Sequence, residues 1–106
     1  MKLQVVSTST YQSSSFHRTV VMTTPNKLIA LAEHLGADYE DNNTGEDKSN
    51  FDFEFETIGG IYFTVYDWKE YRILSPDELV EFHIGGHSKP DTDTSALALI
   101  NALSNF

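Results

Sequence analysis

The chain contains no cysteine and only three prolines, and none of its apolar runs approaches the length of a membrane span, which is about 20 residues. The absence of cysteine excludes disulfides, thiolate metal ligands and thiol catalysis, and it is typical of a reducing compartment. Residues 1–12 include one lysine but lack the apolar run of about seven residues that a secretory signal needs. We therefore expect a cytoplasmic protein that does not cross a membrane.

Positive charge is also scarce, since 7 bases face 16 acids and the formal net charge is −9. Residues 1–32 contain Lys2, Arg18, Lys27 and no acid, whereas all 16 acids lie in residues 33–106. An acidic surface of this kind repels nucleic acid and anionic lipid, because binding a phosphate backbone requires a basic footprint. It favours a protein partner that is basic or that itself binds DNA. Acidity that serves only solubility is the simpler alternative.

The length of 106 residues predicts a single domain, 1–106, with one modest core. Residues 2–7 and 16–23 are short and rich in β-branched side chains, which predicts two strands. Residues 24–36 predict a helix that Thr24 caps, with Pro25 at the first helical position and Gly36 at the end. Residues 37–50 have almost no apolar side chain and predict a loop.

A hairpin is the clearest pattern in the chain. Phenylalanines at 51, 53 and 55 alternate with acids, as in a half-buried strand, and Gly59-Gly60 suits a tight turn. A two-residue turn would place the phenylalanines on one face with the even-numbered residues 62–68. A three-residue turn with a bulge would place them with the odd-numbered residues 61–65. The sequence leaves both registers open.

The remaining residues complete the predicted fold. Residues 75–78 predict a turn and residues 79–86 a further strand, which we expect to break off at Gly85-Gly86. Residues 91–106 predict a helix capped by Thr92 or Asp93, and the expected inward side chains are Ala96, Leu99, Ile100 and Leu103. The order β-β-α-β-β-β-α predicts an α+β fold, an antiparallel sheet of about five strands with two helices on one face.

The two histidines around the second glycine pair are weak metal candidates. His83 and His87 would share one face of a helix, but Gly85-Gly86 argues against a helix there. On a straight strand their rings would lie about 13 Å apart, too far to share an ion. The sequence contains no phosphate-binding loop and no serine elbow. We therefore predict no catalytic residue, no metal and no cofactor, and expect the protein not to be an enzyme.

The run 62–72 combines tyrosine, tryptophan and arginine, which are the residues that anchor protein interfaces. Together with the acids of the preceding strand it supplies the candidate protein-binding residues: Tyr62, Tyr66, Trp68, Tyr71, Arg72, Asp52, Glu54 and Glu56. The alternative is that the aromatic side chains complete the core of a small sheet.

The segments "FTVYDWKEYR" (63–72) and "FHIGGHS" (82–88) resemble a group of small, mostly uncharacterised proteins encoded by bacteriophages, over roughly residues 51–103. The resemblance implies an accessory or host-takeover protein that acts in the host cytoplasm. It implies no catalytic residues.

The leading hypothesis is a small acidic, non-enzymatic protein-interaction module, a phage-encoded modulator or inhibitor of a host protein. A DNA-mimic variant requires one continuous surface of carboxylates: Asp52, Glu54, Glu56, Asp67, Glu70, Asp77, Glu78 and Glu81. A second hypothesis is a protein that binds a nucleotide or metal around His83, His87 and Tyr66. A third is a homo-oligomeric structural protein assembled through the hairpin face.

Overall fold

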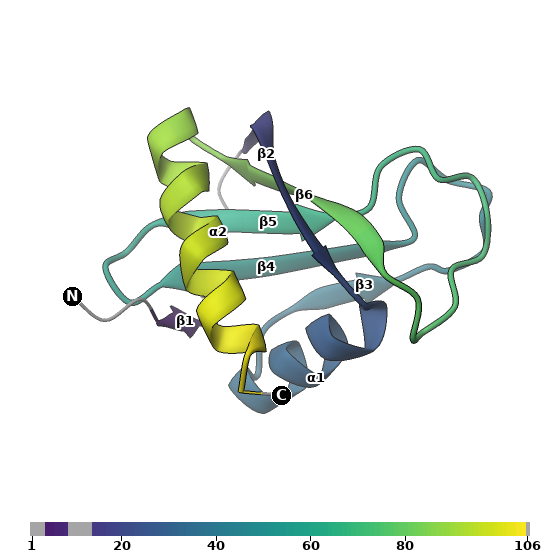
Figure 1. Cartoon of the computed structure of the whole chain (residues 1–106), viewed down its shortest axis with the longest axis horizontal. Helices are drawn as coiled ribbons and strands as arrows, with labels where there is room; N and C mark the ends of the chain where they lie inside the picture. Colours follow the sequence, from purple (N-terminus) through teal and green to yellow (C-terminus); the bar gives the residue numbers. More distant parts are fainter. Residues whose placement is uncertain (1–3, 9–13, 106) are drawn as a thin grey trace.

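The fold is a six-stranded antiparallel sheet with two helices, and the computed structural model describes residues 4–8 and 14–105 (Figure 1). The elements in chain order are β1 (Val5–Val6), β2 (Ser15–Thr23), α1 (Pro25–Leu35), β3 (Tyr39–Asp41), β4 (Phe51–Thr57), β5 (Tyr62–Tyr66), β6 (Val80–Gly86) and α2 (Lys89–Leu103). The strand order is β1-β4-β5-β6-β2, and β3 lies beside β4. The predicted α+β fold is therefore confirmed.

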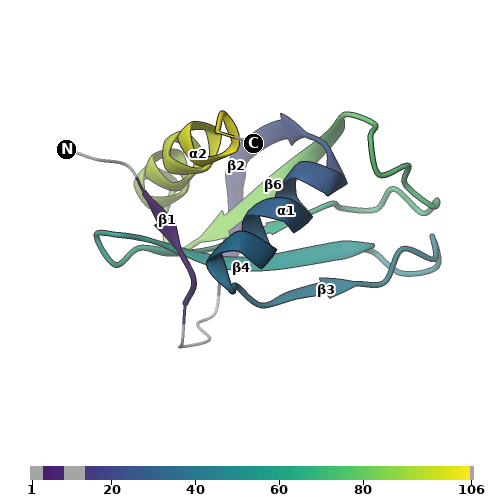
Figure 2. The same cartoon turned by 90° about the horizontal axis from the view of Figure 1, so that it is seen from below.

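Both helices pack on the same face of the sheet (Figure 2). Leu28 and Leu31 of α1 and Leu99 of α2 join Phe53 and Ile84 of the sheet in one apolar core. The other face of the sheet carries neither helix. We call it the helix-free face.

The first helix has the predicted ends. The Thr24 side chain accepts a hydrogen bond from the Lys27 backbone N–H, which satisfies one of the free donors of the first turn. Pro25 begins the helix, and Gly36 ends it with a left-handed φ of 69°.

The second helix starts earlier than its sequence predicts. Its cap is Ser88, whose side chain accepts from the Asp91 N–H, and not Thr92 or Asp93. Thr92 is buried and bonded to Thr19 of β2, so its hydroxyl serves the packing of helix against sheet. Ile100, expected inward, is exposed.

The inward positions of α2 are Ala96, Ala98, Leu99 and Leu103. Thr92 and Ser95 are buried as well, so the inward stripe of α2 begins with polar side chains and Ile100 lies beside it on the solvent side.

The hairpin of β4 and β5 adopts the register of the three-residue turn. Phe53 pairs with Val65 and Phe55 with Phe63, so the phenylalanines share the core face with the odd-numbered residues of β5. The turn is Ile58-Gly59-Gly60, and Gly60 has a φ of 94°, which glycine adopts most readily. The acids of β4 consequently lie on the helix-free face.

The segment 37–50, predicted as a loop, contains the short strand β3. Tyr39 pairs with Phe53 and Asp41 with Phe51, so β3 extends the edge of β4. Three residues offer too little alternation to be detected in the sequence, and pairing with β4 is what makes them a strand.

Gly85-Gly86 does not break the last strand, because both glycines belong to β6 and are buried. A Cβ at Gly85 would lie 2.5 Å from the Thr64 Oγ1, and one at Gly86 would lie 2.9 Å from the Thr92 Cγ2. Because these glycines have no side chain, Thr64 can approach β6 closely from one face and Thr92 from the other, which is a packing role.

Candidate functional site

One row of cross-strand partners runs across the helix-free face through five strands. Val20 of β2 lies opposite His83 of β6, which lies opposite Tyr66 of β5. Tyr66 in turn lies opposite Asp52 of β4, and Asp52 opposite Glu40 of β3. The row thus passes from an apolar side chain through two rings to two carboxylates.

Aromatic rings continue this row along the strands. The Phe16 ring stacks on the His83 ring at 4.1 Å between centroids, and the Tyr66 ring meets His83 edge-on at 5.6 Å. The Trp68 ring meets Tyr66 edge-on at 5.9 Å. Burial lowers the pKa of His83, so this imidazole is neutral at physiological pH and behaves as a flat, largely apolar group.

The β2 side of the face is apolar and accessible to solvent. Phe16, Val20 and Met22 project there, and Met22 is 56% exposed. We call these three residues the apolar end of the face.

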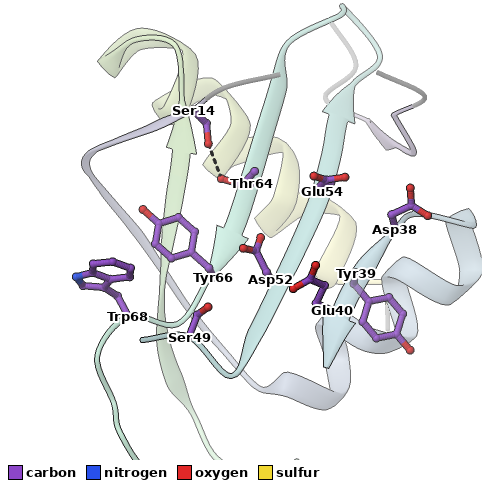
Figure 3. A pocket seen from close by; sticks show the side chains of 10 residues that line it. All are labelled: Ser14, Asp38, Tyr39, Glu40, Ser49, Asp52, Glu54, Thr64, Tyr66 and Trp68. Carbon is purple, nitrogen blue, oxygen red and sulfur yellow. Dashed lines mark hydrogen bonds between the residues drawn. The ribbon is translucent and has the colours of Figure 1, made fainter. Parts of the chain in front are cut away.

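The opposite side of the face contains a hollow of about 570 Å³ between β3, β4 and β5 (Figure 3). Its lining residues are Ser14, Asp38, Tyr39, Glu40, Ser49, Asp52, Glu54, Thr64, Tyr66 and Trp68. We call Glu40, Asp52 and Glu54 the acidic end of the face. The Ser14 and Thr64 hydroxyls are 3.0 Å apart and hydrogen-bonded at the rim.

Asp52 is partly buried in this hollow and has other carboxylates as neighbours. The pKa of Asp52 is raised to about 6, first by burial and then by the neighbouring carboxylates of Glu40, Glu54 and Asp67. The same carboxylate, together with burial, raises the pKa of the Tyr66 hydroxyl. The charged groups of the described residues that shift this pKa are all negative, so the ionised form of Asp52 is electrostatically unfavourable.

We expect the substitution Asp52→Asn to stabilise the protein by about 1–2 kcal/mol near pH 7, after allowing for solvent screening. The folded pKa of Asp52, about 6, lies above the usual value of 3.8 for an aspartate side chain. Folding is therefore favoured by the bound proton at low pH, and this stabilisation is lost as the pH rises through about 6. Urea unfolding of both proteins at several pH values measures the difference.

The gain from Asp52→Asn should shrink as the pH falls and vanish below about pH 4, where the carboxyl is protonated in both the folded and unfolded states. A gain that stays constant across this range would contradict the raised pKa.

The two histidines that were weak metal candidates lie in different surroundings. In residues 4–8 and 14–105, the structure places no three histidine, aspartate or glutamate side chains where they could hold one ion. His83 instead lies between the rings of Phe16 and Tyr66, and His87 follows the end of β6.

The predicted protein-binding residues separate into groups with different accessibility. Tyr66, Asp52, Glu54 and Glu56 lie half-buried on the helix-free face, while Tyr62 is buried and its hydroxyl donates to Glu54. Trp68 is exposed at the edge of the hollow. Tyr71 and Arg72 lie farther along the loop after β5, where Arg72 forms an ion pair of 2.7 Å with Glu78.

The eight carboxylates of the DNA-mimic variant do not share one surface. Asp67 is fully buried and accepts hydrogen bonds from the Asn50 and Phe51 backbone N–H groups. Glu78 is neutralised by Arg72, and Asp77 accepts from the Asn26 side chain beside α1. The continuous surface that a phosphate mimic requires is therefore missing.

Sequence reasoning missed the β3 contribution to the site. Asp38, Tyr39 and Glu40 line the hollow but belong to the segment predicted as a loop. It also missed the apolar end. The only sequence signal for Phe16, Val20 and Met22 was the two-residue period of the strand, which does not say which face stays open to solvent.

Comparison with known proteins returned no match to a family model, a curated protein or a solved structure. No helix among the described residues is long and apolar enough to cross a membrane.

Proposed function

We propose that this protein is a non-enzymatic protein-interaction module that binds its partner through the helix-free face. The observation that carries the proposal is the apolar end, three solvent-exposed side chains that continue directly into a row of aromatic rings in contact with one another. Exposed apolar side chains that form a contiguous patch with a polar rim are typical of protein interaction sites. Aromatic residues are also the usual anchors of such sites.

The biological setting that we propose is a phage-encoded accessory protein that modulates a host protein in the host cytoplasm. The resemblance of residues 63–72 and 82–88 to small phage proteins supports this setting. The acidic character of the chain supports a protein partner rather than nucleic acid.

Edge-to-edge assembly of copies through the sheet is disfavoured by its described edges. β1 and β3 are very short, and β2 is interrupted by a bulge in which Arg18 has a left-handed φ of 68°. Short or bulged edge strands are devices that prevent such pairing. A homo-oligomer that forms through the helix-free face is an outcome of the same experiment.

The test compares two substitutions of equally exposed apolar residues. Met22→Glu introduces a charge at the apolar end, and Leu97→Glu introduces the same charge on the outer side of α2, where Leu97 is 59% exposed. We expect Met22→Glu to reduce partner recovery from a host lysate by about tenfold or more, as for loss of an interface anchor. Leu97→Glu should leave recovery unchanged.

Equal recovery by the two variants would contradict binding through this face. Sedimentation at high concentration identifies the homo-oligomer, because a second copy would then be the occupant that Met22→Glu displaces. A thermal-shift series with nucleotides and divalent metals addresses the small-ligand alternative, since a ligand specific for the folded state raises Tm.

A further inference from the structure

We propose that the element docked on the helix-free face is a basic, amphipathic segment of a partner protein. Its apolar side chains would cover the apolar end, and its lysine or arginine side chains would enter the hollow at the acidic end. This inference rests on the proposed function and names the chemistry of its partner.

Charge complementarity is the first argument. Five acidic residues of the described strands lie on the helix-free face, and Arg18 is the one basic residue that these strands contain: the acids are Glu40, Asp52, Glu54, Glu56 and Glu81. Three of these acids form the acidic end. A segment bearing positive charge is attracted to this face, and a negatively charged one is repelled.

The second argument is that, within residues 4–8 and 14–105, no lysine or arginine is paired with the carboxylates at the centre of the hollow. Lys48 and Lys69 approach the edge of the hollow, but their ammonium groups lie over the Trp68 ring, 5.9 and 5.7 Å from its centroid. Among the described residues, the charged groups that shift the pKa of Asp52 are the carboxylates of Glu40, Glu54 and Asp67. A cation from outside therefore removes a repulsion that exists in the free protein.

The third argument is the direction of the row. Adjacent strands are about 4.8 Å apart, so the four steps from Val20 to Glu40 span about 19 Å. A helix of about 13 residues or an extended segment of about six residues covers that span. Because the row is apolar at one end and acidic at the other, the segment should carry its apolar residues at one end and its basic residues at the other.

Protonation of Asp52 should weaken this binding. Asp52 faces Glu40 on β3, Glu54 on its own strand, Tyr66 on β5 and Asp67 just beyond β5. With its pKa raised to about 6, the carboxyl carries its full charge only above that pH. A bound cation favours the charged form, so binding near pH 6 should release protons.

The experiment uses the full chain and a synthetic peptide with a block of leucine and valine followed by a block of lysine and arginine. Trp68 is the only tryptophan of the chain and lies at the hollow, so its fluorescence reports binding at this place. We expect the peptide to shift the emission of Trp68 in a saturable way. A peptide with glutamine in place of the basic residues, and one with the same composition in alternating order, should each bind at least about tenfold more weakly.

Matched variants assign the binding to the acidic end. The pair Glu40→Gln with Asp52→Asn should weaken peptide binding by about tenfold and reduce its dependence on pH near 6. The pair Glu33→Gln with Glu46→Gln removes the same charge from exposed acids elsewhere, on α1 and in the loop before β4, and should change the affinity less than about twofold.

Equal binding of the basic and glutamine peptides would overturn the inference, as would equal effects of the two double variants. The proposed function would survive either result if Met22→Glu still reduces the recovery of a partner from the lysate. If Met22→Glu leaves partner recovery from the lysate unchanged while the block peptide binds as described, the proposed function fails for that partner. The face is then a cation-recognition surface with another occupant.

Discussion

Replacement of Asp67 by alanine is expected to lower the free energy of unfolding by about 3–4 kcal/mol, the largest effect that we expect from a polar substitution in this chain. The Asp67 side chain is fully buried. Its carboxylate accepts hydrogen bonds from the backbone N–H groups of Asn50 and Phe51, each at 2.8 Å, and from the Asn50 side chain at 3.0 Å. Alanine would leave these buried donors without their acceptor.

Urea unfolding at neutral pH measures this effect, with Glu46→Ala as the control. Glu46 is an exposed acid in the same loop region, so its loss should change stability by less than about 0.5 kcal/mol. Asp67→Asn keeps the shape but presents an amide N–H₂ group to one or more of the donors, and should fall between the two. A loss below about 1 kcal/mol for Asp67→Ala would mean that the carboxylate does not hold the loops together.

Gly45→Ala should destabilise the protein by about 2–3 kcal/mol, which is more than the same change at Gly36. Both glycines have a left-handed backbone, with φ values of 77° and 69°. A Cβ at Gly45 would lie 2.8 Å from the backbone Cα and C of Arg72, whereas nothing lies within 4 Å of one at Gly36. Gly36→Ala should therefore cost only the conformational penalty, about 1 kcal/mol.

Thermal and urea unfolding of the two glycine variants give the difference, which isolates the contact between the two loops. Equal losses for both variants would show that the loop containing Gly45 is free to move away from Arg72.

These two predictions concern the same structural unit, the pair of loops before β4 and after β5. Asn50 joins the loops, because its side chain donates to Asp67 and to the Arg72 carbonyl and accepts from the Gly45 N–H. The unit carries Trp68 to the edge of the hollow. Loosening it should therefore displace an aromatic side chain of the proposed binding face without touching the face directly.

Much of the fold could be predicted because the relevant signals are local. The alternation of Phe51, Phe53 and Phe55 with acids marks β4, and Thr24 and Gly36 mark the ends of α1. The candidate site was predicted less completely. Tyr66, Trp68 and the acids of β4 were among the expected residues, whereas the β3 residues and the apolar end were not.

The sequence by itself determined the two helices and the longer strands, the α+β class and the concentration of acid after residue 32, because hydrophobic period, capping and charge are properties of neighbouring residues. Only the tertiary structure decided the hairpin register, the burial of Asp67 and the row from Val20 to Glu40. Each of these depends on hydrogen bonds and contacts between residues far apart in the chain. A polar residue such as Asp67 looks the same in the sequence whether it faces solvent or finds three buried donors.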